Sequence, residues 1–321
     1  MSEGLIVMDA EAVRARLTIA ACIPLMREAM TALSSVRVEQ HLRSFLPVGE
    51  GRTFALMPAA SADGFGAKLV SVYQDTDRPG RRRHQGLVVL FDPESGAPAF
   101  IGDAEEITRI RTAAASAAAT DALARPDASI LAVIGIGAQA QAHLEAMALV
   151  RPLTEVRVWG RDAESARRFA EAMRKKYDCP VRACATVEAA VQAADIICTV
   201  TASRDPILQR DWVTPGAHVN LVGSSGPHAA EADIELVAAS RFIGDHRAHV
   251  LAHGGEFLRA RQAGRVSDDH VAAEIGEVFA GRRNGRVSPA DITLYKSLGH
   301  AVQDLAAAAW LLSLERTARH G

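Results

Sequence analysis

The spacing of apolar and polar residues in the first third of the chain predicts one helix followed by several strands. The helix is expected at 10–33, and the strands at 36–46, 53–57, 66–73 and 87–91. Within 66–73, Lys68 alternates with apolar neighbours and shares a face with Val70 and Val72. We expect the strand at 53–57 to stop at Pro58. This part of the chain therefore predicts an α+β layer with a largely antiparallel or mixed sheet.

The pattern changes after Asp103, which with Glu106 three residues later resembles the capping box that starts a helix. We expect that helix to end near Arg125, before Pro126. Beyond it, helical segments alternate with short apolar runs at 130–134, 156–159, 181–184, 196–200, 219–222 and 242–243. Two of the intervening helices are expected from about Gln139 and at 163–176. This alternation is typical of a parallel, doubly wound sheet.

The predicted fold class is α/β: a Rossmann doubly wound parallel sheet plus an α+β domain that the C-terminal helix completes. That helix is predicted at 288–317 from its Ala-rich, amphipathic pattern, and we expect it to pack on the first domain. We place the first domain at 1–126 with 295–321, and the Rossmann domain at 127–294. The length of 321 residues is in keeping with two domains.

Composition excludes several classes of function. The formal net charge is -2, so nothing in the bulk charge points to nucleic acid or an anionic membrane. The four cysteines form no CxxC pair, and we expect them to be reduced thiols of a cytoplasmic protein without a signal peptide or membrane span. His246, His249 and His253 have helical spacing but lack an obvious fourth ligand, so we expect no metal. We interpret the basic run at 81–83 as a solvated loop; the alternative is contact with a cofactor phosphate or an acidic substrate.

The strongest chemical signal is the segment Gly135-Ile136-Gly137-Ala138-Gln139-Ala140. A buried strand precedes it and a helix follows it, as in a dinucleotide-binding loop. Gly135 allows the tight turn, Gly137 allows the backbone to approach a pyrophosphate, and Ala140 permits close strand–helix packing. The helix N-terminus offers N–H groups to phosphate oxygens. This segment therefore predicts a nicotinamide dinucleotide site.

The end of the next strand bears on the choice between NAD and NADP. An NAD-type site usually carries Asp or Glu there to bind the ribose 2′-hydroxyl, but this chain has Gly160 followed by Arg161. Arg161 could pair with a 2′-phosphate through two donors, so we favour NADP(H), with NAD(H) as the other possibility. The alternative is that Arg161 is a solvated loop residue and that Asp162 simply caps the next helix.

The chain resembles the ornithine cyclodeaminase/μ-crystallin family through segments that keep the family's order between about residues 40 and 310. Besides the Gly135 loop, these segments are Leu56-Met57-Pro58-Ala59, Gly66-Ala67-Lys68-Leu69-Val70-Ser71, His84-Gln85-Gly86-Leu87, Arg109-Ile110-Arg111-Thr112-Ala113-Ala114-Ala115-Ser116, Gly216-Ala217-His218-Val219-Asn220 and Lys296-Ser297-Leu298-Gly299-His300-Ala301-Val302-Gln303-Asp304-Leu305.

This resemblance implies an N-terminal substrate-binding and dimerisation domain, a Rossmann domain, and a C-terminal helix that returns to the first domain. It also implies hydride transfer between a nicotinamide and the α-carbon of an amino or imino acid. We therefore expect a small imino or amino acid as substrate and a homodimer as the assembly.

An α-imino acid presents a carboxylate beside a C=N bond, so its site needs cations and a proton source. Arg43 and Arg111 are the candidates for the carboxylate, because guanidinium binds it bidentately. Lys68 is the candidate catalytic acid, since burial would bring its pKa toward neutrality. By itself Lys68 could be an edge-strand lysine that reaches solvent, and Arg111 a solvated helix residue. The family uses cations at all three matching positions, which favours the functional interpretation.

Further residues are assigned by the resemblance. Asp304 is expected to help frame the active site, although unaided it is one more helical acid. Beside the cofactor we expect Thr112, Thr201, Ser203 and Val222. For Thr201 and Ser203, the alternative interpretation is a turn with hydroxyl caps.

One residue differs from the pattern of part of the family, and this difference bears on which of the family's reactions we expect. In the segment Val222-Gly223-Ser224-Ser225-Gly226-Pro227, Ser225 stands two residues before the Pro. Ornithine cyclodeaminases and related alanine dehydrogenases carry Asp at that position. Ser cannot act as a carboxylate base, whereas μ-crystallin-like ketimine reductases also have Ser there. We therefore expect Ser225 to lie at the substrate, and the reaction to be NAD(P)H-dependent reduction of a cyclic ketimine such as pyrroline-2-carboxylate or piperideine-2-carboxylate. The alternatives are an ornithine cyclodeaminase or alanine-type dehydrogenase, and a non-catalytic protein that binds dinucleotide or a small ligand.

Overall fold

The computed structural model describes residues 4–73 and 84–320, so the basic run at 81–83 lies outside the described residues. The chain forms two compact units. The first comprises Met1–Arg111 and His300–Gly321, and the second comprises Thr112–Gly299. The first border lies 15 residues before the one expected at 126/127 and falls inside a helix, between Arg111 and Thr112, and the second lies 5 residues after the one expected at 294/295.

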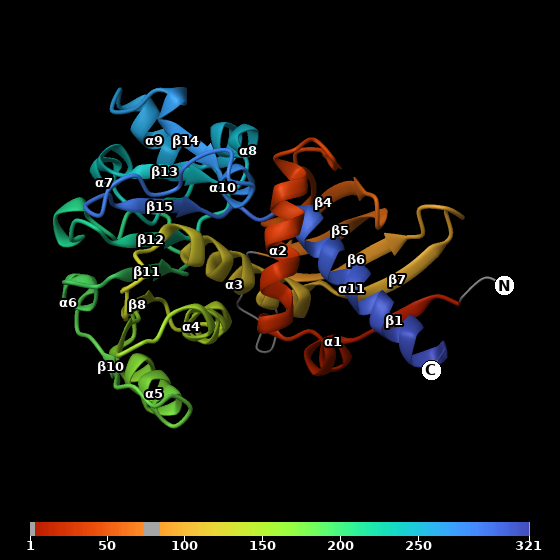
Figure 1. The fold of residues 1–321 in the computed structure, drawn as a ribbon, viewed down its shortest axis with the longest axis horizontal. Helices are drawn as coiled ribbons and strands as arrows, with labels where there is room; N and C mark the ends of the chain where they lie inside the picture. The colour runs from red at the N-terminus through yellow and green to blue at the C-terminus, as the bar shows by residue number, and fades with distance from the viewer. Residues whose placement is uncertain (1–3, 74–83, 321) are drawn as a thin grey trace. The chain divides into compact units, whose positions relative to one another are not determined.

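The first unit is a mixed seven-stranded sheet covered on one face by helices (Figure 1). The strands follow the order β1-β7-β6-β5-β4-β2, with β3 also paired to β4. Among the described strands of this sheet, β1 and β7 pair in parallel and the other pairs are antiparallel. The elements are β1 (Ile6–Met8), α1 (Ala10–Arg16), α2 (Ile19–Leu33), β2 (Glu39–Gln40), β3 (Ser44–Gly49), β4 (Arg52–Ser61), β5 (Gly64–Tyr73), β6 (His84–Phe91), β7 (Pro98–Asp103), the first turns of α3 (Ala104–Leu123) and α11 (Ala301–His320).

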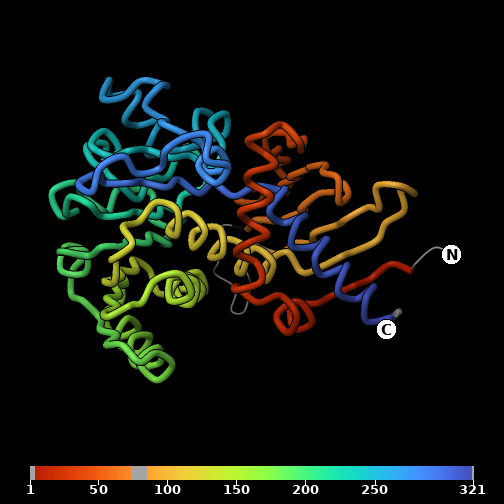
Figure 2. The backbone as a smooth tube through the Cα atoms, viewed as in Figure 1, coloured from red at the N-terminus to blue at the C-terminus, as the bar shows by residue number. Residues whose placement is uncertain are grey.

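Helix α11 is the main cover of this sheet. It packs on β4, β5, β6 and β7 and against α2, so helices from the first and last parts of the described chain lie side by side within the unit (Figure 2). Alternate residues of β4 and β5 point toward it, because Ala55, Met57, Lys68 and Val70 are buried. The prediction that Lys68 shares the face of Val70, and that the last helix packs on the first domain, is confirmed.

Three sequence predictions in this unit are wrong in detail. The helix expected at 10–33 is two helices, because Thr18 accepts a hydrogen bond from the Ala21 N–H and starts α2. The strand expected at 36–46 is split into β2 and β3. Strand β4 continues through Pro58, because β3 pairs only as far as Leu56 and β2 only from Ala59, so the ladder on that side is interrupted there.

The second unit is a parallel eight-stranded sheet in the order β10-β9-β8-β11-β12-β15-β13-β14. Its strands are β8 (Ile130–Ile134), β9 (Glu155–Trp159), β10 (Val181–Ala183), β11 (Ile196–Thr199), β12 (His218–Leu221), β13 (Arg241–Gly244), β14 (Val271–Glu274) and β15 (Thr293–Lys296). Its helices are α4 (Ala138–Val150), α5 (Ala163–Arg174), α6 (Val187–Val191), α7 (Ile234–Ala239), α8 (Arg247–His253), α9 (Gly255–Gln262) and α10 (Ile275–Phe279), with 3-10 turns at Arg210–Trp212 and Asp268–His270. The predicted Rossmann-type parallel sheet is confirmed.

The strands that the last part of the second unit contributes to the sheet were only partly predicted. The helix expected from 288 begins at Ala301, and the residues before it form the inner strand β15, between β12 and β13. Strand β14 was not predicted. Both are four-residue strands that contain polar residues, and only their neighbours in the sheet make them strands.

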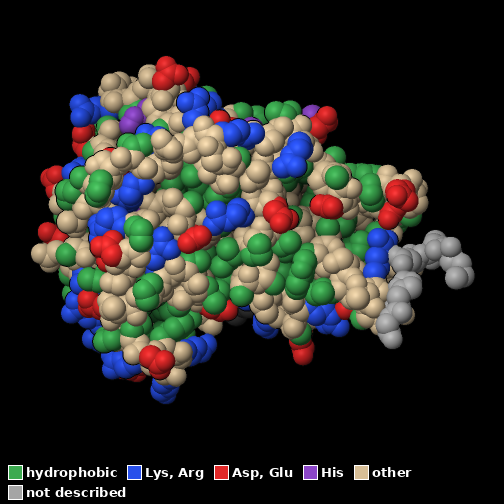
Figure 3. Space-filling view, viewed as in Figure 1, with side chains coloured by type: hydrophobic (Ala, Val, Ile, Leu, Met, Phe, Trp, Pro, Cys, Tyr) green, Lys and Arg blue, Asp and Glu red, His purple; other side chains and the backbone are tan. Residues whose placement is uncertain are grey.

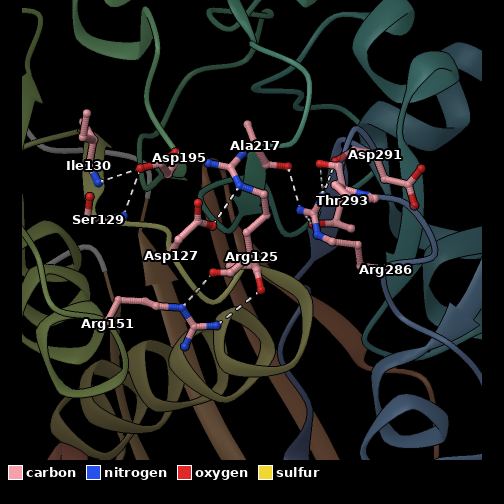
Figure 4. A network of polar contacts seen from close by, with 12 residues as sticks. Arg125, Asp127, Ser129, Ile130, Arg151, Asp195, Ala217, Arg286, Asp291 and Thr293 are labelled. Atoms are coloured by element: carbon pink, nitrogen blue, oxygen red, sulfur yellow. Dashed lines mark hydrogen bonds and ion pairs between the residues drawn. The ribbon is translucent and has the colours of Figure 1, made fainter.

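A network of arginines and acids joins the amino ends of the strands in this unit (Figure 4). Asp195 accepts the backbone N–H groups of Ser129 and Ile130, at 2.9 and 3.0 Å, and pairs with Arg125 at 2.6 Å. Arg286 donates to the Ala217 carbonyl and the Thr293 hydroxyl. These bonds satisfy backbone groups before and at the start of β8 and before β12, and a side-chain hydroxyl of β15, so the network is structural. On the face visible in Figure 3, acidic and basic side chains are interspersed, in keeping with the small net charge.

Candidate functional site

Lys68 lies at the centre of a buried polar cluster in the first unit. Its side chain projects from β5, and the residue is 7% exposed. The Nζ atom donates a hydrogen bond to Thr108 Oγ1 at 2.8 Å and lies 3.5 Å from Asp304 Oδ2. Thr108 comes from α3 and Asp304 from α11, so three elements converge on one ammonium group.

Burial lowers the pKa of Lys68 to about 8. The negative charge of Asp304 raises this pKa, whereas the positive charges of Arg111 and Arg43 lower it further. At neutral pH the amine is therefore mostly protonated, yet it loses its proton far more readily than an exposed lysine. A group with these properties can act as a general acid.

Arg111 and Asp304 form a buried ion pair beside Lys68. Arg111 Nε donates to Asp304 Oδ1 at 2.9 Å, and Arg111 Nη1 donates to Gln303 Oε1 at 2.9 Å. Arg111 is 4% exposed and Asp304 is fully buried. Two acceptors thus fix the guanidinium plane, and the hydrogen bonds of the described residues leave its other N–H groups to a planar anion.

Sequence reasoning missed four polar residues of this cluster: Thr108, Gln303, Gln40 and His300. Gln40 Nε2 is 2.7 Å from His300 Nδ1, and Gln40 Oε1 accepts the Val302 N–H at 3.1 Å. Gln303 Oε1 also accepts the His300 N–H at 3.1 Å. Their positions relative to Lys68 depend on contacts between residues 40 to 262 positions apart in the sequence, which no local pattern reports. Gln303 and Asp304 do, however, share the segment that carried the resemblance.

In the second unit, the residues predicted to bind the cofactor, apart from Thr112 in α3, lie at one edge of the sheet. They follow the carboxyl ends of β8, β9, β11 and β12, which are consecutive neighbours. In open α/β sheets, ligands bind outside this edge. Gly135 ends β8 with φ +128°, and a Cβ there would come within 2.8 Å of the Val200 carbonyl oxygen. Only glycine fits that turn.

The loop after β8 fits a dinucleotide. Gly137 has an ordinary φ of -85°, and a Cβ at this position would meet no atom of the described chain within 4 Å, so the protein's own packing does not require glycine there. It is the N-cap of the 13-residue helix α4, which no described side chain caps. The buried Oε1 atom of Gln139 has no hydrogen-bond partner among the described residues. Open space, uncapped helix N–H groups and an orphaned polar atom together suit a phosphate-bearing ligand.

The end of β9 lacks the acid of an NAD-type site, because Gly160 stands there. A Cβ at Gly160 would come within 2.8–2.9 Å of the Ile136 side chain, so any side chain at this position would require Ile136 to move. Arg161 is exposed beside it. Asp162 accepts the Ser165 N–H at 2.7 Å and is the N-cap of α5, as the alternative interpretation of that residue proposed.

The remaining predicted residues differ in their surroundings. Thr112 is buried in α3, and Val222 is buried after β12. The Ser203 hydroxyl donates to the Asp205 carbonyl within its own turn, whereas the Thr201 hydroxyl donates to Glu231, 30 residues further along the chain. Ser225 is exposed, whereas its neighbour Ser224 is buried and bonded to Lys296 and Glu256. Arg43, in the first unit, is half-buried between β2 and β3.

The described residues contain no group of three or more His, Cys, Asp or Glu side chains placed to hold a metal ion. His246, His249 and His253 lie along α8, with ring centroids 5.2 and 6.4 Å apart in succession. Among the described residues, no helix combines the length and apolar character needed to cross a membrane.

Comparisons with known proteins agree with this arrangement. The family model described as ornithine cyclodeaminase/mu-crystallin matches residues 5–316. Ketimine reductase mu-crystallin of the mouse, Mus musculus, is 37% identical over 282 residues, which cover 84% of this chain and 83% of the relative.

Two solved structures share the complete fold. One is the Delta(1)-pyrroline-2-carboxylate reductase of Thermococcus litoralis in complex with NADH and L-proline, with 30% identity, a TM-score of 0.92, and coverage of 97% of this chain and 98% of the other. The other is an archaeal alanine dehydrogenase dimer with bound NAD, with 28% identity, a TM-score of 0.93, and coverage of 98% and 97%.

Proposed function

Since this chain belongs to the ornithine cyclodeaminase/mu-crystallin family, we propose that it is an NAD(P)H-dependent oxidoreductase that reduces the C=N bond of a cyclic α-imino acid. Pyrroline-2-carboxylate and piperideine-2-carboxylate are the substrates we infer. The names of the relatives support this class, because they include a ketimine reductase and a pyrroline-2-carboxylate reductase.

The observation that carries the proposal is the charge balance around Lys68. Lys68 and Arg111 are buried cations that share the carboxylate of Asp304, and the positive charge of Arg43 also acts on Lys68. Among the contacts of the described residues, two buried cations thus meet one carboxylate, and this excess of positive charge suits a substrate that brings its own carboxylate. Arg111, held by Asp304 and Gln303, is pre-oriented to receive it.

Reduction of an imine adds hydride to carbon and a proton to nitrogen. A bound nicotinamide dinucleotide supplies the hydride. Lys68 Nζ supplies the proton, because its depressed pKa makes the ammonium a sufficiently strong acid near neutral pH. Thr108 and Asp304 hold Nζ in place, and Asp304 stabilises the ammonium when solvent returns the proton.

Ser225 favours reduction over cyclodeamination. Oxidation of an amino acid followed by ring closure needs a base for the amine, and a serine hydroxyl cannot fill that role at neutral pH. The nearest buried acids of that segment, Glu231 and Glu256, already accept several internal hydrogen bonds. A substrate that is already a cyclic imine needs neither the oxidation of an amino acid nor the ring closure.

We infer a preference for NADPH over NADH. The support is Gly160, which stands where an NAD-type site carries an acid, together with the exposed guanidinium of Arg161 one residue later. NAD(H) is the cofactor in the related solved structures, so binding of both forms is compatible with this site.

We also infer a homodimer formed through the first unit. The face of its sheet opposite α11 carries apolar rows that pair across strands, such as Leu56, Leu69 and Leu87. Leu56, Phe65 and Leu87 are 37, 41 and 46% exposed, and a hollow of about 440 Å³ opens on this face between Phe65, Leu69 and Val89. A continuous apolar face of this kind is typical of a subunit interface.

The test is NADPH oxidation, followed by absorbance, with pyrroline-2-carboxylate and with piperideine-2-carboxylate. Lys68→Met should abolish turnover while the dissociation constant for NADPH changes little. Lys175→Met, at an exposed lysine of the second unit, is the matched control and should behave as wild type.

Other outcomes would redirect the proposal. Ornithine-dependent reduction of NAD+ without imine reduction would establish the cyclodeaminase alternative. Tight NADPH binding without turnover of these substrates would favour a binding protein. Full activity of Lys68→Met would exclude Lys68 as the acid.

A further inference from the structure

Glu231 is a fully buried acid whose two oxygens accept four hydrogen bonds. Oε1 accepts the Thr201 N–H at 2.7 Å and the Thr201 hydroxyl at 2.8 Å. Oε2 accepts the Thr199 hydroxyl at 2.8 Å and the Gly223 N–H at 2.7 Å. Each oxygen faces one backbone N–H, which can only donate, so both oxygens must accept a hydrogen bond, as those of a carboxylate do.

These four donors come from two neighbouring loops. Thr199 and Thr201 belong to the end of β11 and the turn after it, and Gly223 belongs to the turn after β12. Glu231 therefore joins the turns at the carboxyl ends of two adjacent parallel strands. The junction is close: a Cβ on Gly223 would lie 2.1 Å from the Thr201 carbonyl oxygen and 2.5 Å from Glu231 Oε1.

The first of these turns also contacts the phosphate-loop glycine. Val200, between Thr199 and Thr201, lies against Gly135 with its carbonyl oxygen 2.8 Å from the Cβ position. Its backbone N–H donates to the Ile134 carbonyl. A shift of the Thr199–Thr201 turn would therefore move the wall of the loop that follows β8.

A second buried acid holds Glu231 itself in place. Glu256 Oε1 accepts the Glu231 N–H at 3.0 Å and the Ser224 hydroxyl. Its other oxygen pairs with Lys296 Nζ at 2.8 Å, and Lys296 also donates to the Ser224 carbonyl at 2.6 Å. Through Lys296, these contacts link Glu231 and Glu256 to β15. They also fix the position of Ser224, which precedes the predicted substrate residue Ser225.

We propose that Glu231 is a positioning residue for the dinucleotide, which sets the spacing of the two turns that follow β11 and β12. The inference rests on the proposed function, because it presumes that a nicotinamide dinucleotide binds at this sheet edge. Glu231 acts through Thr199, Thr201 and Gly223 and contacts no reacting atom. Burial raises its pKa, while its four donors favour the ionised form.

The decisive variant is Glu231→Gln. In either orientation of the amide, its NH2 group faces a backbone N–H, that of Thr201 or that of Gly223, so one loop must move. We expect NADPH binding, measured by fluorescence titration, to weaken by about tenfold or more. The KM of the imine at saturating NADPH should change much less, which separates a cofactor effect from general damage.

The matched control is Asp195→Asn. Asp195 also accepts two backbone N–H groups, but at the amino ends of the strands (Figure 4), where no cofactor residue is predicted. This variant should lower the melting temperature yet keep the wild-type dissociation constant for NADPH within about twofold. The milder Thr199→Val removes one donor without changing shape, and it provides the same test if Glu231→Gln does not fold.

The dissociation constant decides the inference independently of imine turnover. If Glu231→Gln, or Thr199→Val in its place, lowers stability as Asp195→Asn does but binds NADPH like wild type, Glu231 is only structural and the inference is overturned. If wild type binds NADPH but reduces no imine, the proposed reaction fails while the effect of Glu231 on binding still stands.

Discussion

Replacing Asp304 with Asn should shift the pH dependence of imine reduction to lower pH. The change removes the negative charge 3.5 Å from Lys68 Nζ and keeps the size of the side chain. Asp304 raises the pKa of Lys68, which is about 8, and Arg111 and Arg43 lower it. Without Asp304 only the lowering influences remain, so the ammonium becomes a stronger acid.

The size of the shift follows from the distance. At an effective dielectric constant of about 20, two unit charges 3.5 Å apart interact by about 5 kcal/mol. One pKa unit corresponds to about 1.4 kcal/mol. Even if relaxation and water remove two thirds of that energy, the pKa of Lys68 falls by more than about one unit, to below about 7.

The assay is kcat/KM for the imine with saturating NADPH, measured from about pH 6 to pH 9. Wild-type activity should decline as the pH rises through about 8, because the proton donor is lost. In Asp304→Asn the same decline should begin below about pH 7. Titration of the substrate itself is common to both enzymes and cancels in the comparison.

Glu106→Gln is the matched control. Glu106 is another buried carboxylate of the first unit, but it pairs with Arg14 and Arg109 rather than with Lys68. Its profile should keep the wild-type midpoint. A midpoint in Asp304→Asn that stays within a few tenths of a unit of wild type would refute Lys68 as the proton donor or Asp304 as its electrostatic partner.

Three further predictions concern other parts of the molecule. Arg161→Ser should weaken NADPH binding about tenfold or more and leave NADH binding nearly unchanged; equal losses in titrations with both would refute a 2′-phosphate contact. Leu87→Asp, on the exposed sheet face, should give monomers in light scattering at concentrations where wild type is dimeric, and a persistent dimer would place the interface elsewhere. Burial lowers the pKa of His143 to about 4, so its neutral form stabilises the fold above the unfolded pKa of about 6.5 and that contribution is lost as the pH falls below it. His143→Gln should therefore remove about 2 kcal/mol of the stability difference between pH 7 and pH 5 in urea titrations, and an unchanged difference would contradict this assignment.

The sequence by itself determined the parts of this protein that local pattern controls. The apolar run at 130–134 and the glycines after it predicted β8 and the turn that follows, because a buried strand and a tight turn each restrict their residues directly. The alternation around Lys68 predicted that its side chain shares the buried face of Val70. The resemblance then gave these positions their chemical meaning.

Only the tertiary structure decided the rest, because the deciding partners are distant in sequence. Strand β15 carries Thr293 and Lys296 and lies within a segment with helical periodicity, yet pairing with β12 and β13 makes it an inner strand. Thr108 and Gln303 join the Lys68 cluster only when α3 and α11 reach β5. Glu231 is an unremarkable acid in the sequence, and its role depends on four donors that two folded turns aim at one point.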